Sequence, residues 1–148
     1  MVSRGFEAEA TGRITPDLSL QAGYTYNTTE YVRDAAMTGQ PLARFAPRHM
    51  LRVWANYTVP VDERRWTVGA GVQVQSSFSA VAGSVTQRQG GYGLVNLRIG
   101  YRMGRNTTLA LNINNLFDRA YYQSLSGVAW NNRYGEPRSA MLTLRTAF

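Results

Sequence analysis

The sequence predicts an all-β protein, an antiparallel up-and-down sheet of about seven strands that forms a segment of a transmembrane β-barrel. Apolar and polar residues alternate with a period of two along each predicted strand, which gives the sheet one apolar face. The connections alternate between about 3 to 7 and about 13 to 20 residues, as in barrels with short periplasmic turns and long external loops. The chain also ends on a strand whose last residue, Phe148, is aromatic.

The first two predicted strands, residues 6–14 and 18–27, form a hairpin. Apolar or small residues occupy the even positions of both strands, and most odd positions are polar. Pro16 lies in the short connection and presets one turn dihedral. Five further strands show the same alternation: 51–58, 66–75, 95–102, 109–114 and 139–148.

Alternation alone does not separate a membrane barrel from a soluble, tyrosine-rich sheet domain, because both place polar residues on one face. Three long connections favour the barrel, since compact soluble domains seldom hold so many. Aromatic residues on the apolar face also gather near strand ends, where a membrane-interface girdle is expected. These residues are Tyr24, Tyr26, Tyr57, Trp66, Tyr101 and Phe148.

Composition excludes several other classes of protein. No apolar segment is long enough to cross a bilayer as a helix. The chain has no cysteine, so it has no disulfide and no thiolate metal site, and its one histidine, His49, excludes a His-rich metal site. The net charge is +7, but the arginines are scattered through strands and turns, so we expect no nucleic-acid partner.

Two motifs stand near the end of the chain. Residues 111–122 read Leu-Asn-Ile-Asn-Asn-Leu-Phe-Asp-Arg-Ala-Tyr-Tyr, and residues 134–138 read Tyr-Gly-Glu-Pro-Arg. Together with the terminal Phe148, this order and spacing resembles the C-terminal signature of TonB-dependent outer-membrane receptors, particularly ferric-siderophore receptors. Segments 5–12, 20–26 and 46–49 are similar to barrel segments of the same family, so the resemblance covers essentially the whole chain.

The resemblance implies a bacterial outer-membrane receptor, not an enzyme, that binds a ferric siderophore and imports it with energy from the TonB complex. It implies a 22-stranded barrel filled by an N-terminal plug domain, of which residues 1–148 would be the last third, with the plug absent. We therefore expect a fragment that supplies barrel wall and extracellular loops and is not competent alone. Seven strands cannot close as a barrel, and open edges are costly in lipid.

The implied partners are the ferric siderophore, the TonB complex through the missing N-terminal part, outer-membrane lipid and the barrel-assembly machinery. That machinery would read the terminal strand, which makes Phe148 the expected assembly signal. No cofactor is expected, because iron would be carried as the chelate. Haem, cobalamin or another scarce nutrient remains an alternative substrate.

Segments 28–46, 76–91 and 118–133 would then be extracellular. Arginine would offer charge-assisted hydrogen bonds to an anionic chelate, and aromatic side chains would offer stacking area. The candidate ligand contacts are Tyr31, Arg33, Arg44, Phe45, Phe78, Arg88, Tyr121, Tyr122, Trp130 and Arg133.

The polar face would line the barrel lumen and hydrogen-bond the plug and ordered water. Its residues are Glu7, Glu9, Arg13, Arg52, Gln73, Gln75, Asn96, Arg98, Asn112, Asn114 and Arg145. We expect Glu7 and Glu9 to pair with Arg13 or with arginines on neighbouring strands. Residues 134–138 and the Asn-Asn-Leu-Phe-Asp segment are interpreted as structural.

Three competing classes remain. An outer-membrane hydrolase would need a nucleophile beside a base, but the chain has one histidine and no G-x-S-x-G around any serine. A small stand-alone barrel with a structural or adhesive role would need an eighth strand, which could only lie within residues 75–91. A soluble tyrosine-rich binding domain is the third alternative.

Overall fold

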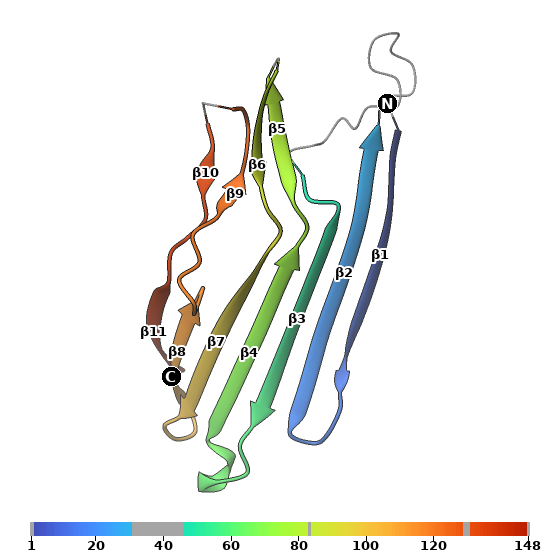
Figure 1. Ribbon diagram of the computed structural model, residues 1–148. Helices are drawn as coiled ribbons and strands as arrows, with labels where there is room; N and C mark the ends of the chain where they lie inside the picture. Colours follow the sequence, from blue (N-terminus) through green and yellow to red (C-terminus); the bar gives the residue numbers. More distant parts are fainter. Residues whose placement is uncertain (1, 31–45, 83, 129–130, 148) are drawn as a thin grey trace.

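The structure is a computed structural model that describes residues 2–30, 46–82, 84–128 and 131–147. Its main element is an antiparallel seven-stranded sheet in the order β1-β2-β3-β4-β7-β8-β11 (Figure 1). The strands are β1 (Val2–Arg13), β2 (Leu18–Glu30), β3 (His49–Thr58), β4 (Trp66–Gln75), β7 (Tyr92–Arg102), β8 (Thr107–Asn114) and β11 (Ser139–Thr146). The seven predicted strands are therefore confirmed.

Two smaller antiparallel pairs stand beyond one end of this sheet, which we call the loop end (Figure 1). β5 (Phe78–Ala82) pairs with β6 (Val85–Gln89), and β9 (Tyr122–Ser124) pairs with β10 (Arg133–Tyr134). The short connections lie at the opposite end, the turn end, and include the 3₁₀ turn η1 (Asp62–Arg64). No helix among the described residues is long and apolar enough to span a bilayer.

The strands of the first hairpin are longer toward the loop end than their alternation predicts. β1 and β2 pair from Arg13 and Ser19 as far as Val2 and Glu30, whereas the sequence pattern covered 6–14 and 18–27. The added residues are largely polar, so no apolar face marks them, and backbone pairing alone continues the ladder. Ile14 falls in the turn instead, where its N–H donates to the Leu18 carbonyl at 2.9 Å.

The segment that could have hidden an eighth strand forms its own hairpin. β5 and β6 pair with each other from Phe78 and Gln89 to Ala82 and Val85, and neither joins the main sheet. Among the described residues, β4 and β7 pair directly, so no strand is inserted between them. The structure therefore gives no support to a small barrel closed by this segment.

The apolar face of the main sheet is exposed. Phe6 is 60% exposed and Leu142 and Leu144 are each 66% exposed. The same face exposes Leu51, Tyr57, Trp66, Val68, Val72, Val74 and Ile99. All of these positions were assigned to the apolar face by alternation. A continuous apolar sheet face of this kind marks a surface that contacts something other than water.

Aromatic groups bound this face at both ends. At the turn end the rings of Trp66 and Tyr101 lie 4.5 Å apart, and toward the loop end the rings of Tyr26 and His49 lie 4.9 Å apart. The eight-residue step from His49 to Tyr57 along β3 spans about 26 Å at the usual rise per residue. Because strands of outer-membrane barrels tilt by about 35–45°, this span projects to roughly 20 Å along the bilayer normal, most of the apolar band of about 25 Å in such barrels.

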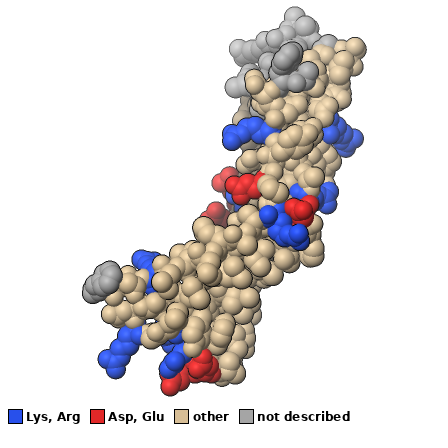
Figure 2. Space-filling view, turned by 90° about the vertical axis from the view of Figure 1, so that its left-hand side faces the viewer, with Lys and Arg blue, Asp and Glu red and all other residues tan. Residues whose placement is uncertain are grey.

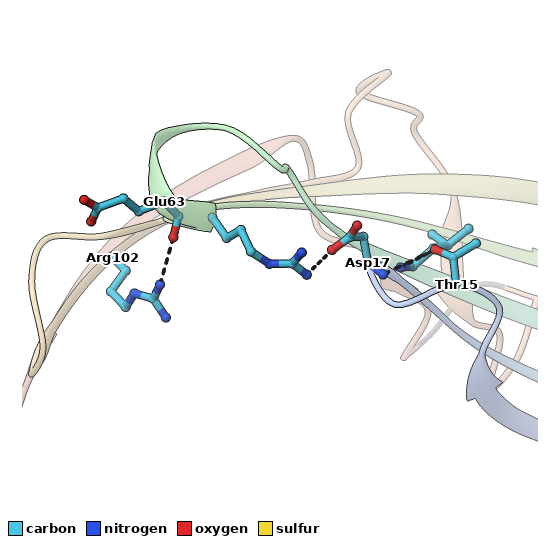
Figure 3. A network of polar contacts seen from close by, with 6 residues as sticks. Thr15, Asp17, Glu63 and Arg102 are labelled. Atoms are coloured by element: carbon cyan, nitrogen blue, oxygen red, sulfur yellow. Dashed lines mark hydrogen bonds and ion pairs between the residues drawn. The ribbon is translucent and has the colours of Figure 1, made fainter.

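Polar contacts tie the short turns together at the turn end (Figure 3). The Thr15 hydroxyl accepts the Leu18 N–H at 3.0 Å, and Arg64 forms an ion pair with Asp17 of the neighbouring turn. Arg102 donates to the Glu63 carbonyl at 3.4 Å. These contacts cross from η1 to the β1–β2 turn on one side and to the end of β7 on the other, so the turns form one connected rim.

Charged side chains are confined to limited regions of the surface. Figure 2 views the molecule from the side of β11 and shows charged groups separated by broad uncharged surface. Among the main-sheet strands, Asp and Glu occur only in β1 and β2. The remaining five strands contain no acidic residue, and β3, β7 and β11 among them carry arginine.

Candidate functional site

The predicted ligand contacts divide into described and undescribed residues. Tyr31, Arg33, Arg44, Phe45 and Trp130 lie outside the described residues, as does Phe148. Phe78, Arg88, Tyr121, Tyr122 and Arg133 lie inside them, at the loop end of the sheet. The structure brings Phe78, Tyr121 and Tyr122 together around one apolar core. Arg88 and Arg133 lie on β6 and β10, respectively.

We call this core the loop-end cluster: Phe78, Ala80, Tyr92, Leu94 and Leu125, with Tyr121 and Tyr122 packed against it. Leu125 is 2% exposed and Phe78 is 4% exposed. The cluster joins the β5–β6 hairpin, the start of β7 and residues 121–125, which contain β9. Two connections that the sequence presents as separate loops are thus one packed unit. Phe78 is an anchor of that unit and offers little surface to a ligand.

Tyr121 and Tyr122 point to different neighbours. The Tyr121 ring lies 4.5 Å from that of Tyr92, and burial raises the pKa of Tyr121 above its ordinary value. The Tyr122 ring stacks on Tyr134 at 4.5 Å with the hydroxyls 3.0 Å apart, and this hydrogen bond is the main reason that the pKa of Tyr122 is raised. Tyr134 is exposed, so this stacked pair presents an aromatic surface at the loop end.

Both predicted arginines among the described residues are exposed. Arg88 donates to the Ser77 hydroxyl at 3.4 Å, across the β5–β6 hairpin. Arg133 pairs in register with Ser124 and is followed directly by Tyr134. The β9–β10 hairpin thus carries an arginine and a stacked aromatic pair, a combination that suits an anionic, partly aromatic ligand.

The Asn-Asn-Leu-Phe-Asp segment is hydrogen-bonded to the second motif through Asn115 and Asp118. Asn115 is buried and adopts a left-handed φ of 48°. Its side-chain N–H groups donate to the carbonyls of Arg119 at 2.9 Å and Glu136 at 3.0 Å, and its side-chain oxygen accepts the Arg119 N–H. Asp118 accepts the Arg138 N–H at 2.8 Å. The two motifs therefore hold each other, which accounts for their spacing.

Gly135 is required by the position of Tyr121. A Cβ added at Gly135 would lie 1.8 Å from Cζ of the Tyr121 ring, while the Gly135 N–H donates to the Tyr121 carbonyl at 2.9 Å. Sequence reasoning did not single out Gly135, Gln89 or Asn115 individually. Gln89 accepts the Tyr122 N–H at 2.9 Å and so connects β6 to β9. The sequence feature that could have pointed to Gly135 and Asn115 is their position inside the two motifs.

The polar face of the sheet forms a hollow of about 580 Å³. Glu7, Glu9, Arg52, Gln73 and Asn96 line it together, as their shared face predicts. Its wall includes Trp54, whose indole N–H donates to the Asn56 side chain at 2.9 Å. The indole lies flat against β4, because a Cβ at Gly71 would lie 2.1 Å from its ring.

The expected pairing of Glu7 and Glu9 is wrong for the arginines that the structure describes. Neither carboxylate forms an ion pair with Arg13 or Arg52, and the ion pairs of the described chain are Arg4 with Glu30, Arg64 with Asp17, and Arg65 with Glu63. Glu9, Gly23 and Arg52 are consecutive partners across three strands. Glu9 and Arg52 are therefore about two strand spacings, roughly 10 Å, apart at the backbone.

The chain is similar to known proteins in both sequence and structure. The sequence profile of the family described as "TonB dependent receptor-like, beta-barrel" matches residues 1–116. The chain belongs to this family. TonB-dependent receptors are proteins of the Gram-negative outer membrane, so the apolar face of the sheet is its lipid-facing surface.

Relatives of this TonB-dependent receptor chain include a ferric-pyoverdine receptor of Pseudomonas sp., 39% identical over 99% of the chain and 18% of the relative. The catecholate siderophore receptor Fiu of Escherichia coli is 32% identical over 97% of the chain and 19% of the relative. Among solved structures, the ferripyoverdine receptor of Pseudomonas aeruginosa bound to ferripyoverdine superposes with a TM-score of 0.82 at 27% identity, over 97% of the chain and 19% of that structure.

The chain thus spans about a fifth of the length of the relatives that it matches. These relatives are transport receptors for ferric siderophores, not enzymes. The match covers every strand of the main sheet except β11, and the relatives extend the likeness over nearly all of the chain.

Proposed function

We propose that the chain is part of an outer-membrane receptor that binds a ferric siderophore and imports it with energy from TonB. The observation that carries this proposal is the 39% identity to a ferric-pyoverdine receptor over 99% of the chain. The exposed apolar face between two aromatic bands supports it, because it suits a wall in lipid.

Within that receptor, residues 1–148 would be the C-terminal portion of a 22-stranded barrel, with the plug domain supplied elsewhere in the whole protein. We call that whole protein the intact receptor. The share of each relative that the chain covers, about a fifth, supports this assignment. Among the described residues, β1 pairs only with β2 and β11 pairs only with β8, so the sheet by itself has two unpaired edges. Unpaired edges are costly in lipid.

The loop end would face outward and contribute to ligand recognition. Tyr122, Tyr134 and Arg133 support this role, since they combine exposed stacking area with a cation. Tyr31, Arg33, Arg44, Phe45 and Trp130 remain proposed contacts. Phe148 remains the proposed signal for the barrel-assembly machinery, and no cofactor is assigned.

Uptake of radioactive iron tests the proposal. Cells that lack other ferripyoverdine receptors would express the intact receptor and receive ⁵⁵Fe-ferripyoverdine, because several of its relatives are ferripyoverdine receptors. We expect saturable uptake that stops when TonB is deleted. Uptake that is equal with and without the receptor, tested for catecholate chelates as well, would contradict the proposal.

A further inference from the structure

One strongly basic surface of the sheet takes no part in the loop-end recognition described above. It lies on the polar face of β7, β8 and β11, toward the turn end. Arg98 and Arg102 of β7 and Arg145 of β11 belong to it, because each shares the face of Asn96, which lines the hollow. All three arginines are exposed.

The register places a row of short side chains between these arginines. Thr67, Gly100, Ala110 and Thr143 are consecutive partners across four strands and form a row of small side chains. Arg98 lies one row to the loop side, and Arg102 and Arg145 lie one row to the turn side. We call this row and its three arginines the basic groove. Its arginine rows are about 13 Å apart, and Arg102 and Arg145 are about 10 Å apart across Thr108.

The floor of the basic groove is closed and carries hydroxyl groups. Ala110 is 5% exposed, and a Cβ at Gly100 would lie 2.5 Å from the Thr67 hydroxyl oxygen, so the glycine keeps this row low. Thr67 and Thr143 stand at the two ends of the row. Long arginine side chains can therefore approach one another over the row from both sides.

The strands of the basic groove do not balance its charge, and the carboxylate of Glu63, in the turn that Arg102 contacts, pairs with Arg65 instead. β4, β7, β8 and β11, which form it, contain no Asp or Glu. Among the described residues none of the three arginines forms an ion pair, and Arg102 donates only to a backbone carbonyl, that of Glu63. Guanidinium groups held in this way suit carboxylates, which they bind through paired hydrogen bonds.

We propose that the basic groove binds the carboxylate groups of an acidic ferric chelate as the chelate passes along the barrel wall toward the turn end. This inference rests on the proposed function, and it assigns Arg98, Arg102 and Arg145 to the exit side of the path rather than to recognition at the loop end. The groove is spaced for more than one acidic group, because its cations are about 10 to 13 Å apart.

The test compares binding with uptake in the intact receptor. Arg98→Gln, Arg102→Gln and Arg145→Gln are combined, and the same three positions are changed to Lys in a second variant that keeps the charge. Arg105→Gln, in the β7–β8 turn and outside the groove, is the control for the loss of an arginine that does not belong to the groove. The probes are ⁵⁵Fe-ferripyoverdine with a free carboxylate and the same chelate with that carboxylate capped as an amide.

We expect the triple Gln variant to bind the acidic chelate at the cell surface as the wild type does, but to import it about 3- to 10-fold more slowly. Uptake of the capped chelate should not change, and Arg105→Gln should import both forms normally. The Lys variant keeps the charge but loses the paired hydrogen bonds, so its uptake of the acidic chelate should lie between that of the triple Gln variant and the wild type. Equal slowing of both forms, or of neither, would overturn the inference.

Three further outcomes are distinguished. If cells with the triple Gln variant admit a large hydrophilic antibiotic that wild-type cells exclude, the basic groove holds a protein segment inside the barrel and the inference is overturned. If the wild-type receptor imports neither form but does import a catecholate chelate, the inference is overturned and the proposed function stands. If it imports none of these chelates, both fail.

Discussion

At the residue scale, close approaches rather than charges explain the two C-terminal motifs. Asn115 satisfies backbone groups from two separate segments, and Gly135 leaves room for the Tyr121 ring. A buried amide that joins three backbone groups is costly to lose, because its partners would remain without hydrogen bonds. The motifs therefore maintain the shape of the loop end, and ligand contact is left to their exposed neighbours.

Gly135→Ala should destabilise the loop end by about 1 to 3 kcal/mol, because the new methyl group overlaps the Tyr121 ring. Thermal unfolding of the intact receptor, or protease sensitivity of the loop end, measures the change. Gly12→Ala is the control, since a Cβ there meets nothing within 4 Å. If the clash is the cause, the cost of Gly135→Ala should disappear in a Tyr121→Ala background, and an unchanged cost there would reject it.

The Tyr122 hydroxyl should titrate above pH 10. Its pKa is raised mainly by the hydrogen bond to Tyr134, so the neutral form is favoured in the folded protein. The stabilisation is present below the unfolded pKa of about 10 and is lost as the pH rises through the higher folded value. Difference absorbance at 295 nm between the wild type and Tyr122→Phe reports this titration. Tyr134→Phe should lower the titration pH, and no shift would argue against the pair.

At the element scale, the predicted strands follow from alternation, and the hairpins of the loop end do not. β4 begins and ends at the predicted residues, because Trp66 to Val74 alternate without interruption. β5 and β6 lie in a serine- and glycine-rich segment whose apolar residues pack against residues 121–125, which contain β9. That contact joins residues far apart in the chain, so no local sequence pattern predicts it. The ion pairing of Glu9 was predicted wrongly for a related reason, since the register places Gly23 between it and Arg52.

Phe78→Ala should uncouple the two hairpins of the loop end. A buried phenylalanine truncated to alanine typically costs about 3 to 5 kcal/mol, and Phe78 belongs to a cluster that contacts both segments. We expect faster hydrogen exchange in β5–β6 and β9–β10 together, with the main sheet unchanged. Val81→Ala, an exposed position on the same strand, is the control. Faster exchange in β5–β6 alone would show that the hairpins are independent.

Deletion of Phe148 should lower the amount of intact receptor in the outer membrane more than it lowers siderophore affinity. Phe148, the last residue of the sequence, is the proposed assembly signal. Immunoblots of outer-membrane fractions and binding of labelled chelate to the receptor that does insert measure the two effects separately. Equal surface levels of the deletion variant and the wild type would refute the assignment.

At the scale of the whole molecule, the two faces of the sheet suit two different environments, lipid and the barrel lumen. The apolar face ends in aromatic bands about 26 Å apart and belongs in lipid. The polar face carries the hollow, the basic groove and all of the charged residues assigned to the lumen. The sequence predicted this division well, because a period of two fixes which residues share a face. The chemistry of the ligand depends on long segments that carry no such period.

Val72→Arg should destabilise the barrel by about 2 to 4 kcal/mol, as expected for arginine near the middle of the lipid-facing band. Gln73→Arg, the next residue, should cost little, because Gln73 lines the hollow. Heat-modifiability on gels and the melting temperature compare the two variants. Similar losses at both positions would contradict the assignment of the faces.

The central claim, that this sheet is a barrel wall with lipid on one face and the lumen on the other, is tested most directly by a nitroxide scan along β4. The chain has no cysteine, so Val68→Cys, Val72→Cys and Gln73→Cys each introduce one labelling site into it. Power-saturation electron paramagnetic resonance of the intact receptor in bilayers should give high oxygen accessibility at positions 68 and 72 and low oxygen accessibility at position 73. High accessibility to a water-soluble nickel chelate at 68 and 72 would contradict the account.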